Sequence, residues 1–195
     1  MRADAKRNYD QLLAVARDLL AKGGADASLR DIARRASVGL GTLYRHFPTR
    51  EALLEALLRT SFDELTVRAG ELETSSSADE ALVSWLRELI AVAHNYGGAI
   101  KSMVAAIEDE TSALHASCVT MKASGTRLLA RAQAKGTARN DIDGADLFAL
   151  VGALAWINDQ PALAPRSGHL FGVIAGAILN KPTPVKNDAV LRPGR

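Results

Sequence analysis

The 195-residue sequence predicts an all-α fold of about nine helices. Apolar residues recur at helical spacing through most of the chain, and no segment shows the strict alternation that is typical of a strand. Glycine pairs, prolines and a serine run separate the periodic segments. Apolar residues make up 48% of the chain and charged residues 24%. This composition is ordinary for a globular protein, so the chain can bury a substantial core.

The first two helices are expected on either side of a glycine-containing segment. Residues 12–20 place apolar side chains at helical spacing, and Gly23 with Gly24 supplies a stop. Ser28 is the expected N-cap of the second helix, with Asp31 three residues later in a capping-box pattern. This helix should end near Ser37.

The third helix is short, and the fourth is long. Gly39 and Gly41 surround the start of the third helix, which ends at Phe47 because Pro48 disfavours helical geometry in the residue before it. Thr49 is the expected cap of the fourth helix, whose apolar stripe continues to residue 65.

Five further helices are expected after the serine run 75–77. Their predicted ranges are 81–96, 99–108, 112–135, 145–158 and 168–180. We divide the chain into an N-terminal helix-turn-helix domain (1–50), a larger helical domain (51–180) and a polar tail (181–195). The tail contains Pro184 and Pro193 and is expected to be disordered.

The charge distribution and the cysteine content limit which compartment and which partners are expected for this protein. Residues 1–60 contain 11 Lys and Arg against 7 Asp and Glu, and the rest of the chain contains 13 against 15. This basic N-terminal part is a weak indication of a polyanionic partner. No stretch is apolar enough for a membrane span, the first ten residues are charged rather than apolar, and Cys118 is the one cysteine. A cytoplasmic protein is expected, with Cys118 either buried and inert or a reactive thiol.

The second and third helices have the spacing of a helix-turn-helix motif, in which the second helix of the pair lies in the major groove of DNA. The stretch SLRDIARRASVGLGTLYRHFPTREALLEAL, residues 28–57, resembles the DNA-binding domain of the TetR (tetracycline repressor-like) family of transcriptional regulators. The resemblance covers about the first 60 residues. It departs from the family pattern at Ser37, where many members have Gly, and at Gly39, where many have Ser or Thr.

The resemblance implies a homodimeric repressor that binds a palindromic operator in double-stranded DNA. Its first domain would bind DNA, and its second would bind a small, partly hydrophobic effector and form the dimer. Alternatives are an activator, a regulator controlled by a partner protein, or a helical interaction module without DNA binding. The DNA-binding positions that it implies are Ser28, Leu40, Gly41, Thr42, Tyr44, Arg45, His46, Thr49 and Arg50. An ordinary solvated face is the alternative for Tyr44, Arg45 and His46.

No enzyme, cofactor or metal site is expected. His94, His115, His169 and Cys118 form no recognisable spacing for a nucleophile, an acid–base pair or a metal. Glu108, Asp109, Glu110 and His115 carry ligand atoms suited to a metal, but a solvated helix junction is the preferred interpretation. The few charges in the middle helices favour an uncharged or weakly polar, partly hydrophobic effector over a polyanion.

The expected effector pocket consists of apolar and aromatic side chains of the middle helices, with Asn158 or Asp159 as a polar anchor. The alternative is that each belongs simply to the core. The candidate pocket residues are Trp85, Leu89, Tyr96, Met103, Ile107, Leu114, Cys118, Met121 and Trp156.

The expected dimer interface lies on the last two helices, which carry apolar residues at helical spacing. Gly172, Ala175 and Gly176 form a ridge of small residues that would let two backbones approach closely. The alternative is that the apolar stripes face the core of their own subunit. These stripes comprise Leu147, Leu150, Val151 and Leu154 on one helix and Phe171, Ile174 and Ile178 on the other.

Overall fold

The computed structural model describes residues 2–21, 28–96, 100, 103–158 and 160–180. Within these residues it contains nine α-helices, one 3₁₀-helix and no strand, which confirms the all-α prediction. None of the helices in the described part is long and apolar enough to cross a membrane. The predictions for Gly23 and Gly24, for Asp159 and for the tail 181–195 lie outside the described residues.

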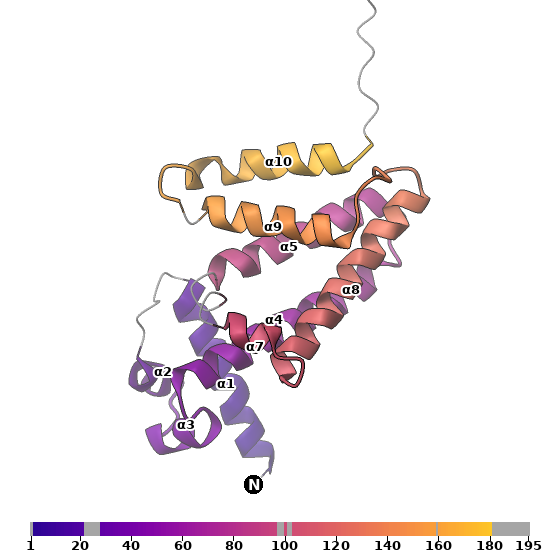
Figure 1. Ribbon diagram of the computed structural model, residues 1–195. Helices are drawn as coiled ribbons and strands as arrows, with labels where there is room; N and C mark the ends of the chain where they lie inside the picture. Colours follow the sequence, from indigo (N-terminus) through magenta and orange to yellow (C-terminus); the bar gives the residue numbers. More distant parts are fainter. Residues whose placement is uncertain (1, 22–27, 97–99, 101–102, 159, 181–195) are drawn as a thin grey trace, which may run out of the picture.

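One long helix, two short helices and the start of a second long helix form the lower end of the molecule (Figure 1). Helix α1 (Arg2–Ala21) packs against α2 (Leu29–Arg35), α3 (Leu40–His46) and the start of α4 (Arg50–Leu72). Leu12 and Leu43 are fully buried between them. We call this unit, α1 to α3 with the first turns of α4, the head.

Side chains begin two of the head helices, as predicted. Ser28 Oγ accepts a hydrogen bond from the Asp31 backbone N–H at 3.1 Å and donates to the Asp31 carboxylate at 2.8 Å. This contact, followed by the ion pair with Arg34, lowers the pKa of Asp31. Thr49 Oγ1 accepts from the Ala52 N–H at 3.1 Å. Helix α3 has Gly39 at its N-cap and no side-chain cap there.

The turn between α2 and α3 places a non-glycine residue in the left-handed region. Ser37 has φ +52°. An L-residue costs about 1–2 kcal/mol in this region, whereas glycine adopts it freely. This backbone conformation explains why many members of the family that the sequence resembles have glycine at this position.

We expect Ser37→Gly to raise the free energy of unfolding by about 0.5 kcal/mol, because relief of the strain exceeds the extra entropy of an unfolded glycine. Ser37→Val should lower it by about 1–3 kcal/mol, since a β-branched side chain fits this region poorly. Ser37 is exposed, so packing changes little. Urea unfolding measures both variants, and equal stability of the Gly and Val variants would contradict the assignment of strain.

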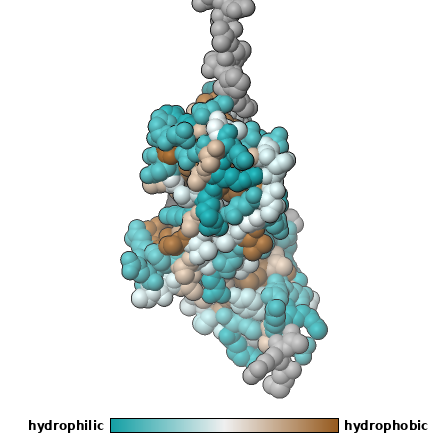
Figure 2. Space-filling view, turned by 90° about the vertical axis from the view of Figure 1, so that its right-hand side faces the viewer, coloured by the Kyte–Doolittle hydropathy of each residue, from teal (hydrophilic) through white to brown (hydrophobic). Residues whose placement is uncertain are grey.

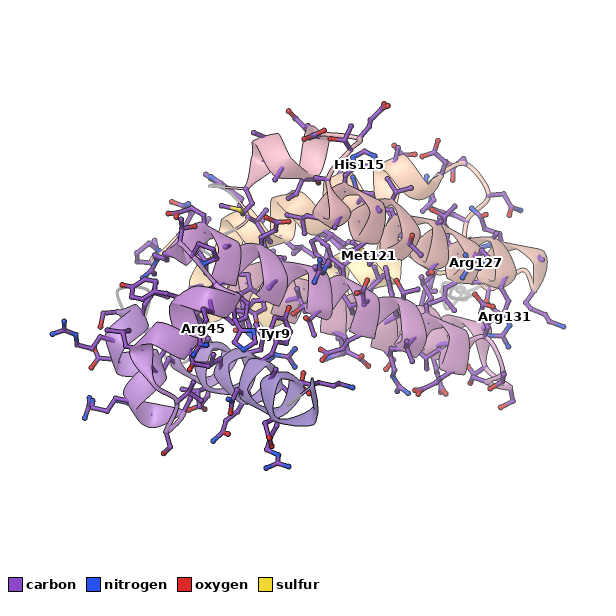
Figure 3. All side chains as sticks on the ribbon, turned by 90° about the horizontal axis from the view of Figure 1, so that it is seen from below. Tyr9, Arg45, His115, Met121, Arg127 and Arg131 are labelled. Carbon is purple, nitrogen blue, oxygen red and sulfur yellow. The ribbon has the colours of Figure 1, made fainter. Side chains whose placement is uncertain are left out.

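The middle of the molecule is a bundle in which α4 packs against α5 (Ala78–Asn95) and α8 (Ala113–Ala134). Two arginines of α8 hold the far end of α4: Arg127 pairs with Glu73 at 2.9 Å, and Arg131 donates to the carbonyl oxygens of Leu72 and Ser75. Both arginines lie at the end of α8 away from the head (Figure 3). The buried residues of the head and the bundle form one continuous core.

The helix predicted over 99–108 lies partly outside the described residues. Within the described part, α7 (Val104–Glu108) follows Met103 and agrees with the end of that prediction. Ser112 caps α8 by accepting from the His115 N–H at 2.9 Å, and His115 Nδ1 lies 2.7 Å from the Ile107 carbonyl oxygen. These contacts fix α7 against the start of α8.

The last two helices lie at the opposite end of the molecule from α2 and α3 (Figure 1). Helix α9 (Gly144–Asn158) packs on α5 and α8, and a 3₁₀ turn (Ala164–Arg166) leads into α10 (Ser167–Ile178). An isolated antiparallel bridge joins Ala138 to Leu179 and ties the end of α10 to the loop after α8. From the right-hand side of Figure 1, the surface is largely hydrophilic, with smaller hydrophobic patches (Figure 2).

Candidate nucleic-acid interface and effector site

Helix α3 has a buried face and an exposed polar face. Leu43 and Phe47 point inward and are at most 2% exposed, as expected for core residues. Tyr44 is 48% exposed, and Arg45 is also exposed. The Tyr44 hydroxyl and the Arg45 guanidinium both belong to exposed side chains. Both groups can donate hydrogen bonds to phosphate or to base edges.

Arg45 is folded back along α3 onto the preceding turn. Its Nη2 donates to Thr42 Oγ1 at 2.9 Å, and its Nε donates to the Gly41 carbonyl oxygen at 3.3 Å. Thr42 is partly exposed, and a Cβ built at Gly41 would meet no atom within 4 Å. These three residues therefore form one accessible polar group at the start of the helix.

His46 has a different environment from its neighbours. Its ring lies edge-on to Tyr9 of α1, with the centroids 5.8 Å apart, and Tyr9 also contacts Phe47 at 5.0 Å. Figure 3 shows Tyr9 and Arg45 together at the head end. His46 thus helps to fix α3 against α1 and is only partly exposed. Sequence reasoning did not single out Tyr9, because its partners are distant in sequence.

The start of α4 adjoins α3. Thr49 is the N-cap and Arg50 the first residue of α4, so the N-terminus of a 23-residue helix begins here. A helix N-terminus attracts phosphate. On α2, Arg30 and Arg35 are exposed and add positive charge to the head, a signal already visible in the run RDIARR but not included among the predicted positions. Ser28 is exposed at the start of the same helix.

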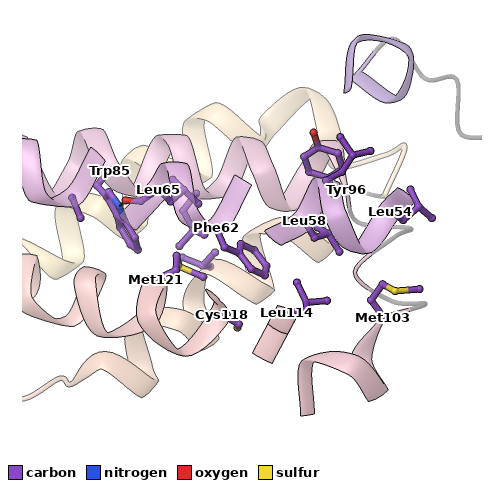
Figure 4. Close-up of a cluster of buried hydrophobic side chains, with 14 of the residues drawn as sticks. Leu54, Leu58, Phe62, Leu65, Trp85, Tyr96, Met103, Leu114, Cys118 and Met121 are labelled. Carbon is purple, nitrogen blue, oxygen red and sulfur yellow. Dashed lines mark hydrogen bonds between the residues drawn. The ribbon is translucent and has the colours of Figure 1, made fainter. Parts of the chain in front are cut away.

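Most of the predicted pocket residues come together in one buried cluster between α4, α5 and α8 (Figure 4). Trp85 is fully buried and donates through Nε1 to the Leu65 carbonyl oxygen at 2.8 Å. Ile107 is partly buried and packs against the same core. We call this group the core cluster; its predicted members are Trp85, Leu89, Tyr96, Met103, Leu114, Cys118 and Met121.

Two predicted pocket residues lie elsewhere. Trp156 is 58% exposed on α9, so the structure does not bring it into the core cluster. Asn158 lines an open groove of about 380 Å³ between α5 and the start of α10, together with Arg87, His94 and Phe171. The Arg87 guanidinium lies over the Phe171 ring, 4.7 Å from its centroid.

The acidic junction before α8 is a turn with its own hydrogen bonds. Asp109 accepts from the Thr111 N–H and hydroxyl at 2.9 and 2.7 Å, and these contacts lower its pKa. Within the described residues, no group of three His, Cys, Asp or Glu side chains is arranged to hold a metal. Burial raises the pKa of the Cys118 thiol, which disfavours the reactive thiolate.

The apolar stripes predicted for the dimer interface lie inside the chain. Leu147, Val151 and Leu154 of α9 and Phe171 and Ile178 of α10 are at most 8% exposed, and Leu150 and Ile174 are partly buried. They pack around a small internal space against Leu86 and Ile90 of α5. The structure therefore places these side chains in the core of their own subunit, which is the alternative stated above.

The opposite faces of α9 and α10 are exposed and carry little charge, with Asp146 at the start of α9 as the charged residue. A Cβ built at Gly152, Gly172 or Gly176 would meet no atom within 4 Å, so these faces point away from the chain. We call this surface the outer face; its exposed residues are Ala149, Gly152, Ala153 and Trp156 of α9 and Gly172, Val173, Gly176 and Ala177 of α10.

The fold and the exposed face of α3 define a helix-turn-helix DNA-binding protein with a large helical second domain. The family model for bacterial regulatory proteins of the tetR family matches residues 12–57, and the model for the C-terminal domain of SbtR-like transcriptional regulators matches residues 77–176. The chain belongs to the TetR family of transcriptional regulators.

Individual relatives agree with this assignment. A TetR transcriptional regulator from Streptomyces coelicolor is 32% identical and superposes with a TM-score of 0.70 over 88% of this chain and 99% of its own. The HTH-type transcriptional repressor KstR2 from Rhodococcus jostii is 29% identical over 75% of this chain and 76% of its own. Matches to three further curated regulators span only 28–38% of their lengths.

The fold also matches LfrR, a TetR-like regulator from Mycobacterium smegmatis whose structure is a complex with proflavine. This protein is 22% identical, and the match covers 90% of this chain and 98% of that one with a TM-score of 0.63. The likeness is one of fold.

Proposed function

We propose that the protein is a homodimeric repressor of transcription that binds a palindromic operator and leaves it when a small, partly hydrophobic effector binds. The observation that carries this proposal is the exposed face of α3 with Thr42, Tyr44 and Arg45, followed directly in the chain by the N-terminus of α4. The division into a DNA-binding head and a regulatory helical domain is part of the proposal. KstR2, a repressor, supports the direction of regulation.

The outer face supports the dimer. Helix α9 is apolar nearly all round, with Asp146 as its one charged residue, and α10 carries no charged residue. A helix that is apolar on every side needs cover on every side. The core of the subunit covers one side of each helix, and an equivalent pair of helices from a second chain would cover the other. The glycines and alanines of the outer face would let the backbones of the two chains approach closely.

The core cluster supports the effector site. Its two methionines and one cysteine are adaptable side chains that can repack around an apolar guest. The cluster also reaches toward the head through Tyr96, which is buried at the end of α5 and lies close enough to Arg17 of α1 to act on its pKa. Arg17 in turn pairs with Glu64 of α4 at 2.9 Å. Burial acts to lower the pKa of Arg17, but the hydrogen bond to Glu64 and the nearby Tyr96 leave that pKa raised.

This chain of contacts gives the proposed route for release. An effector that moves Tyr96 would disturb the pairing of Arg17 with α4 and so shift the head. Such coupling is reciprocal, so operator DNA must weaken effector binding by the same factor. LfrR, which binds proflavine, supports a small-molecule ligand.

Selection from random DNA duplexes tests the proposed function. Because the two heads of the proposed dimer are related by a two-fold axis, the selection should recover a palindrome. Its half-sites should lie about 34–36 Å apart or a multiple of that distance. A thermal-shift screen of apolar compounds should then find one that stabilises the protein and weakens operator binding. Recovery of asymmetric sites alone would count against the dimeric repressor, and a stabilising ligand without effect on DNA binding would not be the effector.

We expect Arg50→Ala to reduce the salt dependence of DNA binding. Loss of one phosphate contact should make the negative slope of log K against log salt shallower by about 0.9 and weaken binding to operator and random DNA alike. Arg166→Ala is the matched control, since it removes the same charge from an exposed site next to α10, at the other end of the molecule. Titrations at several salt concentrations measure the slope. An unchanged slope for Arg50→Ala would show that this guanidinium does not contact phosphate.

A further inference from the structure

The contact between Thr42 and Arg45 occupies one lone pair of the threonine hydroxyl and leaves its proton available to donate. Thr42 Oγ1 accepts a hydrogen bond from Arg45 Nη2 at 2.9 Å. A hydroxyl has one proton, and the acceptor role here is taken by its oxygen lone pair. Its own proton is therefore left to donate, and it becomes a better donor because the guanidinium polarises the oxygen.

Arg45 keeps donors free in the same place. A guanidinium has five N–H donors and no acceptor. Two of these donors are used within α3, one on Thr42 and one on the Gly41 carbonyl oxygen at 3.3 Å. Three remain on an exposed side chain. The pair as a whole therefore offers several donors next to one another, against one remaining lone pair on Thr42 Oγ1.

Gly41 leaves this group accessible. It is exposed, and a Cβ built on it would meet no atom within 4 Å. The side of α3 that carries the Thr42–Arg45 pair thus has no side chain at position 41 that would hold a base edge away. Leu40, the preceding residue, is partly buried and packs against the core.

The four bases differ in the number of hydrogen-bond acceptors that they present to such donors in the major groove. In the major groove guanine presents two acceptors, O6 and N7. Adenine presents one acceptor beside an amino donor, cytosine an amino donor, and thymine one acceptor beside a methyl group. Only guanine lets two adjacent donors bond at once without leaving a buried donor unpaired, and an unpaired donor is costly.

We propose that Thr42 and Arg45 act as one donor pair that reads a guanine in each half-site of the operator. The inference rests on the proposed function and adds the identity of a base to it. The hydrogen bond within the free protein sets the pair before DNA arrives, so less rotamer freedom is lost on binding.

The test compares full-length wild type with three variants on the same selected operator. For each G·C pair of a half-site, a duplex is made with that pair replaced symmetrically in both half-sites, and its affinity is measured by fluorescence anisotropy. Wild type should prefer guanine at one position by about tenfold or more. Thr42→Val, which keeps the shape but removes the hydroxyl, and Arg45→Lys, which keeps the charge but removes the fork, should reduce this preference to about threefold or less.

Thr42→Ser is the matched control, since it keeps the hydroxyl and should keep the guanine preference. Circular dichroism and random-duplex affinity verify that each variant is folded and still binds DNA. Retention of the guanine preference in Thr42→Val and Arg45→Lys would overturn the inference, as would a thymine preference that Thr42→Ser abolishes, because that points to the methyl group. If wild type selects no palindrome, the proposed function fails first; a palindrome without this guanine overturns the donor pair alone.

Discussion

Gly176→Glu is expected to give a folded monomer that binds its operator at least about 100-fold more weakly than wild type. Gly176 is exposed on α10, and a Cβ there meets nothing within 4 Å in its own chain, so the substitution should leave the subunit folded. Across a dimer interface, the new carboxylate would lose water without gaining a partner. Each half-site would then be held by one head, and the gain from binding two linked heads would be lost.

Sedimentation velocity, circular dichroism and operator titration measure the three parts of this result. Gly70→Glu is the matched control, since Gly70 is also an exposed helical glycine with no atom within 4 Å of a built Cβ, but it lies on α4. That variant should remain a dimer of unchanged affinity. A dimeric Gly176→Glu protein with wild-type affinity would place the interface away from the outer face.

Gly125→Ala should destabilise the protein by about 2–4 kcal/mol, although alanine is normally the better helix residue by about 1 kcal/mol. A Cβ at this position would lie 2.4 Å from Trp85 Cη2 and 2.5 Å from Cζ3. The indole cannot retreat easily, because it is fully buried and its Nε1 donates to the Leu65 carbonyl oxygen at 2.8 Å. Phe148 also lies 3.1 Å from the built Cβ.

Urea unfolding measures this loss, with Gly70→Ala as the control that should be neutral or stabilising. A double-mutant cycle gives a sharper result. In a Trp85→Phe background the clashing ring atoms are gone, so Gly125→Ala should cost about 1 kcal/mol or less. Additive effects of the two substitutions would show that Trp85 does not limit the space at Gly125.

Local signals in the sequence were enough to predict most of the helices. Ser28 and Thr49 were expected caps and are seen to cap, and α3 ends at His46 before Phe47 and Pro48, as the proline required. Boundaries were less certain. Helix α5 begins at Ala78 rather than at 81, because Ser77 provides an N-cap that periodicity alone does not reveal.

The faces of the last two helices could not be chosen from the sequence. Leu147 and Leu154 recur at helical spacing, but so do Ala149, Gly152 and Trp156 on the other side of α9. When both sides of a helix are apolar, periodicity does not say which side faces its own core. The larger side chains are buried within the subunit, and the smaller ones are exposed together with Trp156.

The contacts of the candidate site were hidden for a related reason. Sequence reasoning treated Arg45 and His46 alike as possible DNA contacts, yet Arg45 lies along α3 and His46 packs against Tyr9 from another helix. Gly125 was not singled out, because its role depends on an indole 40 positions away in the chain. Such pairings are set by the tertiary packing of helices and not by local pattern.

Helix α4 has a mechanical consequence that follows from its length. Its 23 residues span about 34 Å from Arg50 in the head to Leu72, which Arg131 of α8 holds at the far end. A rod anchored at one end amplifies rotation: a tilt of about 5° displaces the free end by about 3 Å. In the proposed dimer, opposite tilts of the two α4 helices would change the distance between the heads by about 6 Å, nearly two base-pair steps. Small rearrangements beside α4 can therefore change the spacing of the heads by a distance comparable to base-pair steps.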